Sequence, residues 1–240
     1  MNIDVTGVSS DFPDFRVAVV VARGLTIPAE RPPELAALIA AREEACRARW
    51  GGTDLSAIPG IAVWRAAYRA FGVKKTSYRC AVERLVKNVL AGRTLPPINA
   101  FVDAYNAVSL THVMPLGADD LAHIVGDVAF RRSRPGDTFL DMAGGENGEG
   151  GPVADPPKEG EVVYADAEKV LCRRWNWRQD ARSLVTPSTT EAIVTIQTNG
   201  EGDLDAAVAD LDALIRRFCG GSVSVAIADR TRPVLEIGQS

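Results

Sequence analysis

Residues 170–179 read Val-Leu-Cys-Arg-Arg-Trp-Asn-Trp-Arg-Gln, and the last seven of these hold three arginines and two of the chain's four tryptophans. The apolar residues 170–172 predict the end of a strand that leaves the core. Side chains alternate between two faces along an extended backbone, so Arg174, Asn176 and Arg178 are expected on one face. The opposite face would then carry Arg173, Trp175, Trp177 and Gln179.

The first of these faces would present an amide between two guanidinium groups. A guanidinium group binds phosphate or carboxylate oxygens through paired hydrogen bonds, and an amide both donates and accepts. The pattern therefore indicates an anion-binding surface. The alternative is a lattice of arginines stacked on tryptophans that only fixes the edge of a sheet.

The composition is typical of a globular protein. The chain has 240 residues, of which 46% are apolar, enough to bury the core of one large domain or two small ones. A net charge of −4 argues against a uniformly basic nucleic-acid-binding protein, yet 27 lysines and arginines leave room for a local basic patch. The four cysteines are far apart in apolar surroundings, and there are two histidines, so we expect reduced thiols and no metal site.

The ends and the hydropathy of the chain predict a cytoplasmic protein. Residues 1–5 contain neither the basic start nor the apolar segment of a secretory signal. No segment approaches the roughly eighteen consecutive apolar residues that a membrane-spanning helix requires. We therefore expect no membrane partner.

Hydrophobic periodicity predicts strands and helices without regular alternation. The β-branched run 15–22 predicts a buried strand. Further strands are expected at 161–164, 192–198, 222–228 and 233–237, and helices at 32–50, 61–71, 78–90, 98–108 and 204–218. A turn is expected at 114–120, a hairpin around Pro135-Gly136 between 124–132 and 138–140, and a surface loop at 143–158. This order favours the α+β class.

Two groups of polar residues stand out elsewhere in the chain. Asp103 and Asn106 are three residues apart in an otherwise apolar helix, where they either contribute to a site or brace a neighbouring strand. Lys74, Lys75 and Ser77 form a basic loop in which Ser77 is expected to cap the next helix. No glycine-rich phosphate loop and no catalytic triad motif is present. The residues alone thus predict an α+β protein with an anion-binding cleft.

A family resemblance appears at residues 97–110, Pro-Ile-Asn-Ala-Phe-Val-Asp-Ala-Tyr-Asn-Ala-Val-Ser-Leu, and 114–120, Met-Pro-Leu-Gly-Ala-Asp-Asp. These segments resemble the B3/4 domain, the tRNA-editing module of the β subunit of bacterial phenylalanyl-tRNA synthetase. Free-standing relatives of that module carry residues 173–179 nearly as they stand here. The resemblance covers about residues 12–198. It implies a mixed-sheet fold of interleaved halves, in a single domain 1–240 with residues 203–237 packed on the rest.

The resemblance also implies a function. The module hydrolyses an aminoacyl-tRNA that carries the wrong amino acid, without a metal or another cofactor, and a free-standing relative would do so in trans. The partner would be the acceptor end of aminoacylated tRNA rather than DNA, and we expect a monomer. The family's histidine falls at Gly117, and its tyrosine-recognising glutamate falls near Thr195 or Ile196. These departures argue against editing of tyrosyl-tRNA and favour a small or hydroxylated aliphatic amino acid.

Asn106 matches the pocket asparagine of the family. From the chemistry of ester hydrolysis we expect Asn106, Asn176 and Arg178 to be the catalytic residues. Asn106 would orient water or the substrate ammonium group, Asn176 would contact the ester or the adenosine, and Arg178, with Arg174, would hold the phosphate or ribose. The expected substrate-binding residues are Tyr105, Asp103, Arg174, Trp175, Trp177, Gln179 and Gly117. The expected tRNA-binding residues are Lys74, Lys75, Ser77 and Arg173. A tRNA-binding module without catalysis, or a protein that binds a small molecule or amino acid, are the alternative functions.

Overall fold

The longest β-branched run of the chain forms the middle of a sheet. The computed structural model describes residues 1–74, 78–142 and 151–237. Strand β2 (Phe15–Arg23) pairs antiparallel with β10 (Glu191–Asn199) and with β11 (Ser222–Ala228), and β3 (Leu116–Asp120) pairs with the far side of β10. The order is therefore β11-β2-β10-β3. Most side chains of β2 are buried, which explains why a run of β-branched residues lies at the centre.

A second sheet of mixed direction lies beside the first. Its order is β12-β1-β4-β7-β8-β9, with β1 and β4 parallel and the other neighbours antiparallel. Its strands are β1 (Asn2–Asp4), β4 (Val128–Arg132), β7 (Val162–Ala165), β8 (Val170–Arg173), β9 (Arg178–Gln179) and β12 (Val234–Glu236). A two-stranded sheet pairs β5 (Leu140–Asp141) with β6 (Val153–Ala154).

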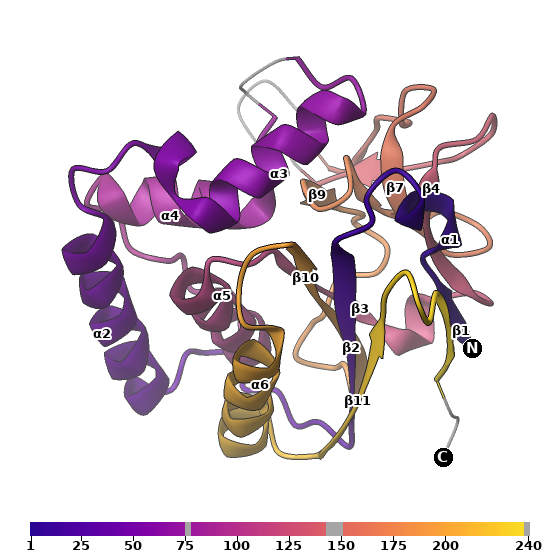
Figure 1. Cartoon of the computed structure of the whole chain (residues 1–240). Coiled ribbons are helices and arrows are strands. Elements are labelled where there is room, and N and C mark those ends of the chain that lie inside the picture. Colours follow the sequence, from indigo (N-terminus) through magenta and orange to yellow (C-terminus); the bar gives the residue numbers. More distant parts are fainter. Residues whose placement is uncertain (75–77, 143–150, 238–240) are drawn as a thin grey trace.

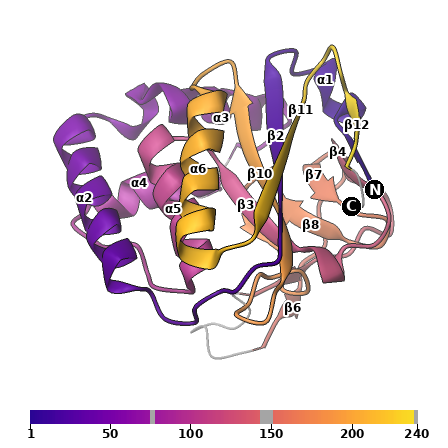
Figure 2. The same ribbon diagram turned by 90° about the horizontal axis from the view of Figure 1, so that it is seen from below.

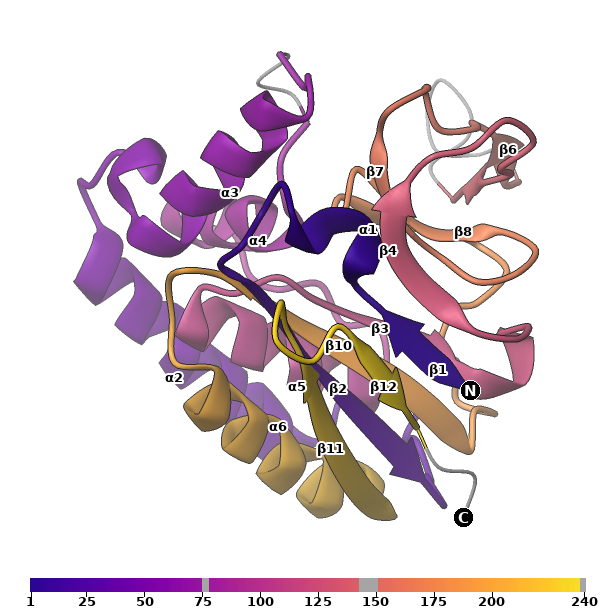
Figure 3. The ribbon, with the colours of Figure 1, turned by 45° about the vertical axis from the view of Figure 1, so that its right-hand side comes forward.

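Helices α2 to α6 gather on one side of the four-stranded sheet, and the six-stranded sheet lies on the other, where α1 contacts β4 (Figure 3). Helix α6 packs on β2, β10 and β11, and α5 packs on β3 and against α6 and α2, as Figure 2 shows from below. The helices are α1 (Thr6–Ser9), α2 (Pro33–Trp50), α3 (Pro59–Ala70), α4 (Ala81–Leu90), α5 (Ala100–His112) and α6 (Leu204–Cys219), with single 3-10 turns η1 (Leu55–Ala57) and η2 (Leu121–His123).

The C-terminal segment joins both sheets. After α6, β11 extends the four-stranded sheet, and β12 then pairs with β1 at the edge of the six-stranded one. Strands β1 and β12, near the two ends of the described chain, consequently lie side by side (Figure 1).

The α+β class and the mixed sheet are confirmed. The expected hairpin at Pro135-Gly136 is wrong, because β4 pairs with β1 and β7 while β5 pairs with β6. The turn expected at 114–120 is also wrong, since 116–120 form strand β3. Helix α5 begins at Ala100 because the side chain of Asn99 caps it by accepting a hydrogen bond from the Val102 amide.

Candidate functional site

A cavity of about 150 Å³ lies where α5, β3 and β10 meet the β8–β9 hairpin. Seven of the residues predicted from the sequence line it, and they come from segments that are far apart in the chain. These seven are Tyr105, Asn106, Gly117, Asn176, Trp177, Arg178 and Gln179. The remaining lining residues are Ala81, Leu116, Ala118, Asp119, Tyr164, Cys172, Thr195 and Gln197.

The β8–β9 hairpin corrects the expected geometry of residues 173–179. Residues 174–177 form a turn rather than an extended strand, and Arg174 and Trp175 have φ values of 45° and 70°. Side chains in such a turn do not alternate between two faces, so Arg174, Asn176 and Arg178 do not form one surface. The amide of Trp175 donates to the Val162 carbonyl over 2.7 Å, which holds the turn against β7.

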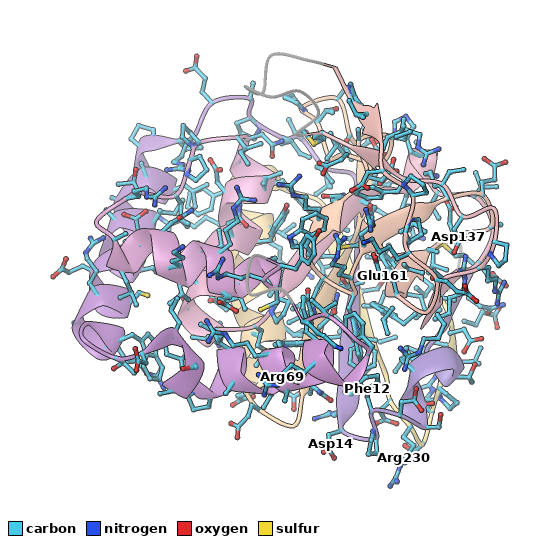
Figure 4. All side chains as sticks on the ribbon, turned by 90° about the horizontal axis from the view of Figure 1, so that it is seen from above. Phe12, Asp14, Arg69, Asp137, Glu161 and Arg230 are labelled. Atoms are coloured by element: carbon cyan, nitrogen blue, oxygen red, sulfur yellow. The ribbon has the colours of Figure 1, made fainter. Side chains whose placement is uncertain are left out.

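Trp175 lies in the core and not in the cavity. It is fully buried, and its ring centroid lies 4.6 Å from that of Phe12, 4.9 Å from Phe15 and 5.2 Å from Trp64. Phe12 is labelled in Figure 4, which views this region from above. The prediction that Trp175 binds substrate is therefore wrong, because neighbouring aromatic rings cover it.

Asn176 is held in one orientation at the cavity wall. The hydroxyl of Tyr68 donates to its Oδ1 over 2.9 Å, and its Nδ2 donates to Gln197 Oε1 over 3.1 Å. Gln197 in turn donates to Thr195 Oγ1 over 3.2 Å. This chain of hydrogen bonds holds the two amide groups in place at the wall before any ligand arrives.

Asp119 is a site residue that sequence reasoning missed. Its Oδ1 accepts hydrogen bonds from Ser183 Oγ over 2.6 Å and from Gln179 Nε2 over 2.9 Å. Burial raises the pKa of its carboxyl to about 7, although these two hydrogen bonds favour the charged form. Once residues 116–120 are known to form a strand, alternation places Gly117 and Asp119 on the same face, and that pattern was the available signal.

Several other polar groups around the cavity have no partner among the described residues. The hydroxyl of Tyr164 is buried and makes no hydrogen bond there. The side-chain amide of Asn106 likewise makes none within the described part of the chain. Burial raises the pKa of Tyr105, of Tyr164 and of the Cys172 thiol above their ordinary values, so all three side chains are neutral near pH 7.

The ring of Trp177 is surrounded by arginines. The guanidinium carbons of Arg174 and Arg178 lie 4.2 Å and 4.5 Å from its centroid, and Tyr78 meets it edge-on at 5.2 Å. Arg174 also lies 3.7 Å from the Tyr78 ring centroid. The stacked lattice considered for this segment is thus present, and its members Trp177 and Arg178 also line the cavity.

The two flanking arginines differ in their ion pairing. Arg178 Nη1 pairs with the carboxylate of Asp141 at the cavity mouth. Arg174 is almost fully buried; its Nε lies 3.8 Å from a carboxylate oxygen of Glu161, and its Nη1 has no hydrogen-bond partner among the described residues. Burial lowers the pKa of Arg174, but a guanidinium group stays charged at neutral pH. Arg174 lies behind Trp177 and does not line the cavity, so its expected substrate contact is not observed.

Arg173 is a structural residue rather than a surface cation. Its side chain is fully buried, and it donates to both carboxylate oxygens of Glu161 over 2.9 Å and 2.8 Å. It also pairs with Asp155. Glu161, labelled in Figure 4, lies within the body of the molecule. The prediction that Arg173 binds tRNA is wrong, because the side chain is fully buried and the buried Glu161, together with Asp155, already occupies its donors.

Asp103 likewise faces away from the cavity. Its Oδ2 accepts from Arg31 Nε over 2.8 Å and its Oδ1 accepts from the Ile98 amide over 3.0 Å. The substrate-binding prediction for Asp103 is therefore wrong, and the bracing role considered for it is the observed one.

Lys74 lies at a separate basic hollow of about 120 Å³ on α3 and the start of α4. Arg65, Arg69 and Arg79 share this hollow. Arg65 and Arg79 both pair with Glu83, whereas Arg69 and Lys74 form no ion pair with any described residue. Lys75 and Ser77, the other residues predicted here, lie outside the described part of the chain.

An outer groove of about 510 Å³ adjoins the cavity. The two share Tyr105, Ala118, Arg178 and Gln179, so the groove and the cavity lie on either side of the same side chains. Its other walls are largely apolar and include Ile98, Val102, Met142, Leu184, Val185 and Pro187.

Residues 1–74, 78–142 and 151–237 contain neither a metal-binding cluster nor a membrane-spanning helix. No group of three or more histidine, cysteine, aspartate or glutamate side chains there is arranged to hold a metal ion. Within the same ranges, no helix has the length and apolar character needed to span a bilayer.

Comparison with known proteins assigns a family. The profile of the B3/4 domain matches residues 63–201. Among solved structures, an N-terminal fragment of the phenylalanyl-tRNA synthetase β-subunit from Pyrococcus horikoshii aligns with a TM-score of 0.43 and 11% sequence identity. The alignment covers 92% of this chain and 50% of that fragment, so this chain spans about half of its length. No curated protein matches the sequence.

Proposed function

Since the chain belongs to the B3/4 domain family, we propose that it is an aminoacyl-tRNA deacylase that acts in trans. The substrate would be a tRNA charged with the wrong amino acid, and the reaction is hydrolysis of the ester between the amino acid and the terminal ribose. Its role would be in the fidelity of translation.

The observation that supports the proposal is that two segments far apart in the sequence line one cavity. Asn106 from α5 and Asn176 and Arg178 from the β8–β9 hairpin line the same hollow. A site for ester hydrolysis needs hydrogen-bonding groups directed at the reacting centre from more than one side, and helix and hairpin supply them from different elements.

The sizes of the two hollows support a binding mode in which each holds a different part of the substrate. The inner cavity of about 150 Å³ suits an aminoacyl group, and the outer groove of about 510 Å³ suits the terminal adenosine. Apolar walls such as Val102 and Val185 provide surfaces on which a flat base packs. Arg178 lies at the junction, where the ribose and its phosphate would be.

The chemistry needs no protein nucleophile. Water adds to the ester carbonyl carbon, the tetrahedral oxyanion collapses, and the ribose oxygen leaves as a hydroxyl group after taking a proton. The unpaired amide of Asn106 is free to orient the water or the oxyanion, and the fixed amide of Asn176 directs its NH₂ group along the cavity wall. The vicinal ribose hydroxyl of the substrate is available to relay the proton.

The basic hollow around Lys74 supports a path for the acceptor stem. Tyr78 lines that hollow and packs edge-on against Trp177, which lines the cavity. A tRNA whose terminal adenosine lies in the groove would therefore pass close to Arg69 and Lys74. Neither of these forms an ion pair with a described residue, so both have donors for phosphate oxygens.

A single-turnover assay over a panel of correctly and wrongly charged tRNAs tests the proposal. At least one mischarged tRNA should lose its amino acid faster than the uncatalysed ester. The variant Asn106→Ala should slow that reaction about tenfold or more while the protein stays folded. Asn88→Ala on α4 is the matched control, because Asn88 does not line the cavity. No acceleration for any charged tRNA would refute the proposal.

The alternative functions give different results in a binding assay. A tRNA-binding module without catalysis would bind charged tRNA with strong salt dependence and leave the ester intact. A small-molecule binder would bind a free amino acid as well as its tRNA ester, with little response to salt. Arg178→Ala should weaken tRNA binding under the proposed function.

A further inference from the structure

The charges around the inner cavity are unbalanced. Among the described residues that line it, Asp119 and Arg178 are the two with charged side chains. Arg178 is already paired with Asp141. Asp119 forms no ion pair with any described residue, and its hydrogen-bond partners are the neutral groups of Ser183 and Gln179. The cavity therefore holds a buried carboxyl group without a cation.

A second, independent feature of the lining indicates that a ligand is missing. Tyr164 is 2% exposed, and its hydroxyl makes no hydrogen bond to a described residue. A buried hydroxyl group without a partner costs free energy that a ligand would recover. The side-chain oxygen of Asn106 is likewise an unused acceptor in the lining, as far as the described residues go.

We propose that Asp119, Tyr164 and Asn106 form a binding site for a primary ammonium group. In the deacylase reaction on which this inference rests, that group is the free α-ammonium of the aminoacyl ester. The chain would consequently act on aminoacyl-tRNA and reject esters whose amino group is acylated, such as peptidyl-tRNA.

The chemistry of the ligand follows from the acceptors. An ammonium group has three N–H donors and no acceptor, and the three side chains offer a carboxylate, a phenol oxygen and an amide oxygen. A neutral hydroxyl group would satisfy at most part of this set and would leave the carboxyl without a counter-charge. An acylated amine has one N–H, carries no charge and brings extra atoms into a cavity of about 150 Å³.

The ionisable groups around Asp119 do not supply the positive charge that its carboxylate would need. Lys169 lies near enough to favour the ionised form of Asp119, but it pairs with Asp166 over 2.6 Å. Tyr105, Tyr164 and Cys172 also border the carboxyl group, and burial keeps all three neutral near pH 7. Burial raises the pKa of Asp119 to about 7, so a bound cation is what would favour its ionised form at neutral pH.

The first test compares one charged tRNA with its N-acetylated form. The tRNA is the one that the deacylation panel identifies, and the proteins are the parent, Asp119→Asn and Asp120→Asn. The amide of Asp119→Asn keeps the oxygen that accepts from Ser183 and Gln179, so the fold is expected to persist. Asp120 is the matched control, because it lies beside Asp119 on β3 and bonds instead to the Ala122 amide and Thr189.

The parent should cleave the free-amino ester at least about tenfold faster than the N-acetylated one, as a charge-assisted hydrogen bond predicts. Asp119→Asn should lose most of that preference through slower cleavage of the free-amino ester, and Asp120→Asn should retain it. Equal cleavage of both esters by the parent, or an unchanged preference in Asp119→Asn, would overturn the inference.

A second test needs no tRNA and separates this inference from the proposed function. Binding of alanine, serine and phenylalanine methyl esters, and of their N-acetyl derivatives, is followed by nuclear magnetic resonance chemical shifts of the parent and of Asp119→Asn. The site predicts shifts at cavity residues with the free-amino esters alone, weakened by the substitution. If these appear while no tRNA is deacylated, the ammonium site stands and the deacylase proposal fails. If the N-acetyl derivatives shift the same residues equally, the ammonium site fails.

Discussion

One carboxyl group, that of Asp119, should contribute less to the stability of the folded protein as pH rises from about 4 to about 7. Burial in the folded protein raises the pKa of Asp119 from its ordinary 3.8 to about 7. Between these two values the folded state keeps a proton that the unfolded state has lost. Stability contributed by this proton is complete below about pH 4 and is gone above about pH 7.

The size of the effect follows from the same two values. Each pH unit in that interval changes the free energy of unfolding by about 1.4 kcal/mol. Between about pH 4.5 and about pH 8 the Asp119 contribution should therefore fall by roughly 3 kcal/mol. The amide that the variant Asp119→Asn introduces would not titrate, and its side-chain oxygen would still accept from Ser183 and Gln179.

Urea denaturation of the parent and Asp119→Asn over this pH range measures the effect. The difference in unfolding free energy, variant minus parent, should rise with pH up to about pH 7 and then stay level. Subtracting the parent removes the other titrating groups, and Asp120→Asn shows whether any buried aspartate of β3 gives the same curve. Parallel pH profiles for parent and Asp119→Asn would refute the reasoning, because they would mean that Asp119 ionises as freely when folded as when unfolded.

Three further substitutions test the neighbouring structure. Arg173→Ala leaves Glu161 buried without its partner and should lower the unfolding free energy in urea by about 3–5 kcal/mol, so a loss below about 1 kcal/mol would contradict the buried pair. Gly117→Ala adds a Cβ with no other atom within 4 Å, so the unfolding free energy should stay level or rise by about 0.4–1 kcal/mol. The added methyl group should nevertheless slow deacylation, because Gly117 lines the cavity. An unchanged deacylation rate would mean that the substrate binds elsewhere. Tyr68→Phe removes the hydroxyl group that donates to Asn176 Oδ1, and it should lower the unfolding free energy, measured by heat or urea, by about 1–3 kcal/mol. It should also lower the kcat of deacylation. A variant as active as the parent would show that this hydrogen bond does not orient Asn176.

The elements that the sequence predicts well are those whose local pattern agrees with their final surroundings. The β-branched run of β2 is buried in the middle of a sheet, and α6 has an apolar stripe that meets that sheet. In both, local preference and tertiary packing favour the same structure. Their bounds were accordingly predicted to within a residue or so.

The segments predicted wrongly are those whose backbone conformation depends on contacts with residues far away in the sequence. Residues 116–120 contain glycine and two aspartates, which are rare in strands, and they form β3 because β10 pairs with them. Residues 174–177 contain no glycine or proline, yet Arg174 and Trp175 adopt positive φ values. Contacts from Trp175 to Phe12 and Phe15 pull the turn toward the core, and no local pattern reports such contacts.

The site could be predicted in part for the same reason. The resemblance to the B3/4 domain located Asn106, Asn176 and Arg178, which do meet at one cavity. It gave no indication that Arg173 is fully buried or that Asp119 borders the cavity, because both follow from the hairpin turn and from β3. The turn at 174–177 and strand β3, neither of which the sequence predicts, thus determine which charged residues can contact a ligand.

The buried groups of the cavity that lack a partner among the described residues show why the burial of Arg173 and the position of Asp119 matter for function. The hydroxyl of Tyr164 and the carboxyl of Asp119 are both buried, and each lowers the stability of the empty protein. Elsewhere the same fold pairs its buried charges closely, as Arg173 with Glu161 and Lys169 with Asp166 show. The buried carboxyl group without a cation inside the cavity is therefore the observation on which the proposed ammonium site rests.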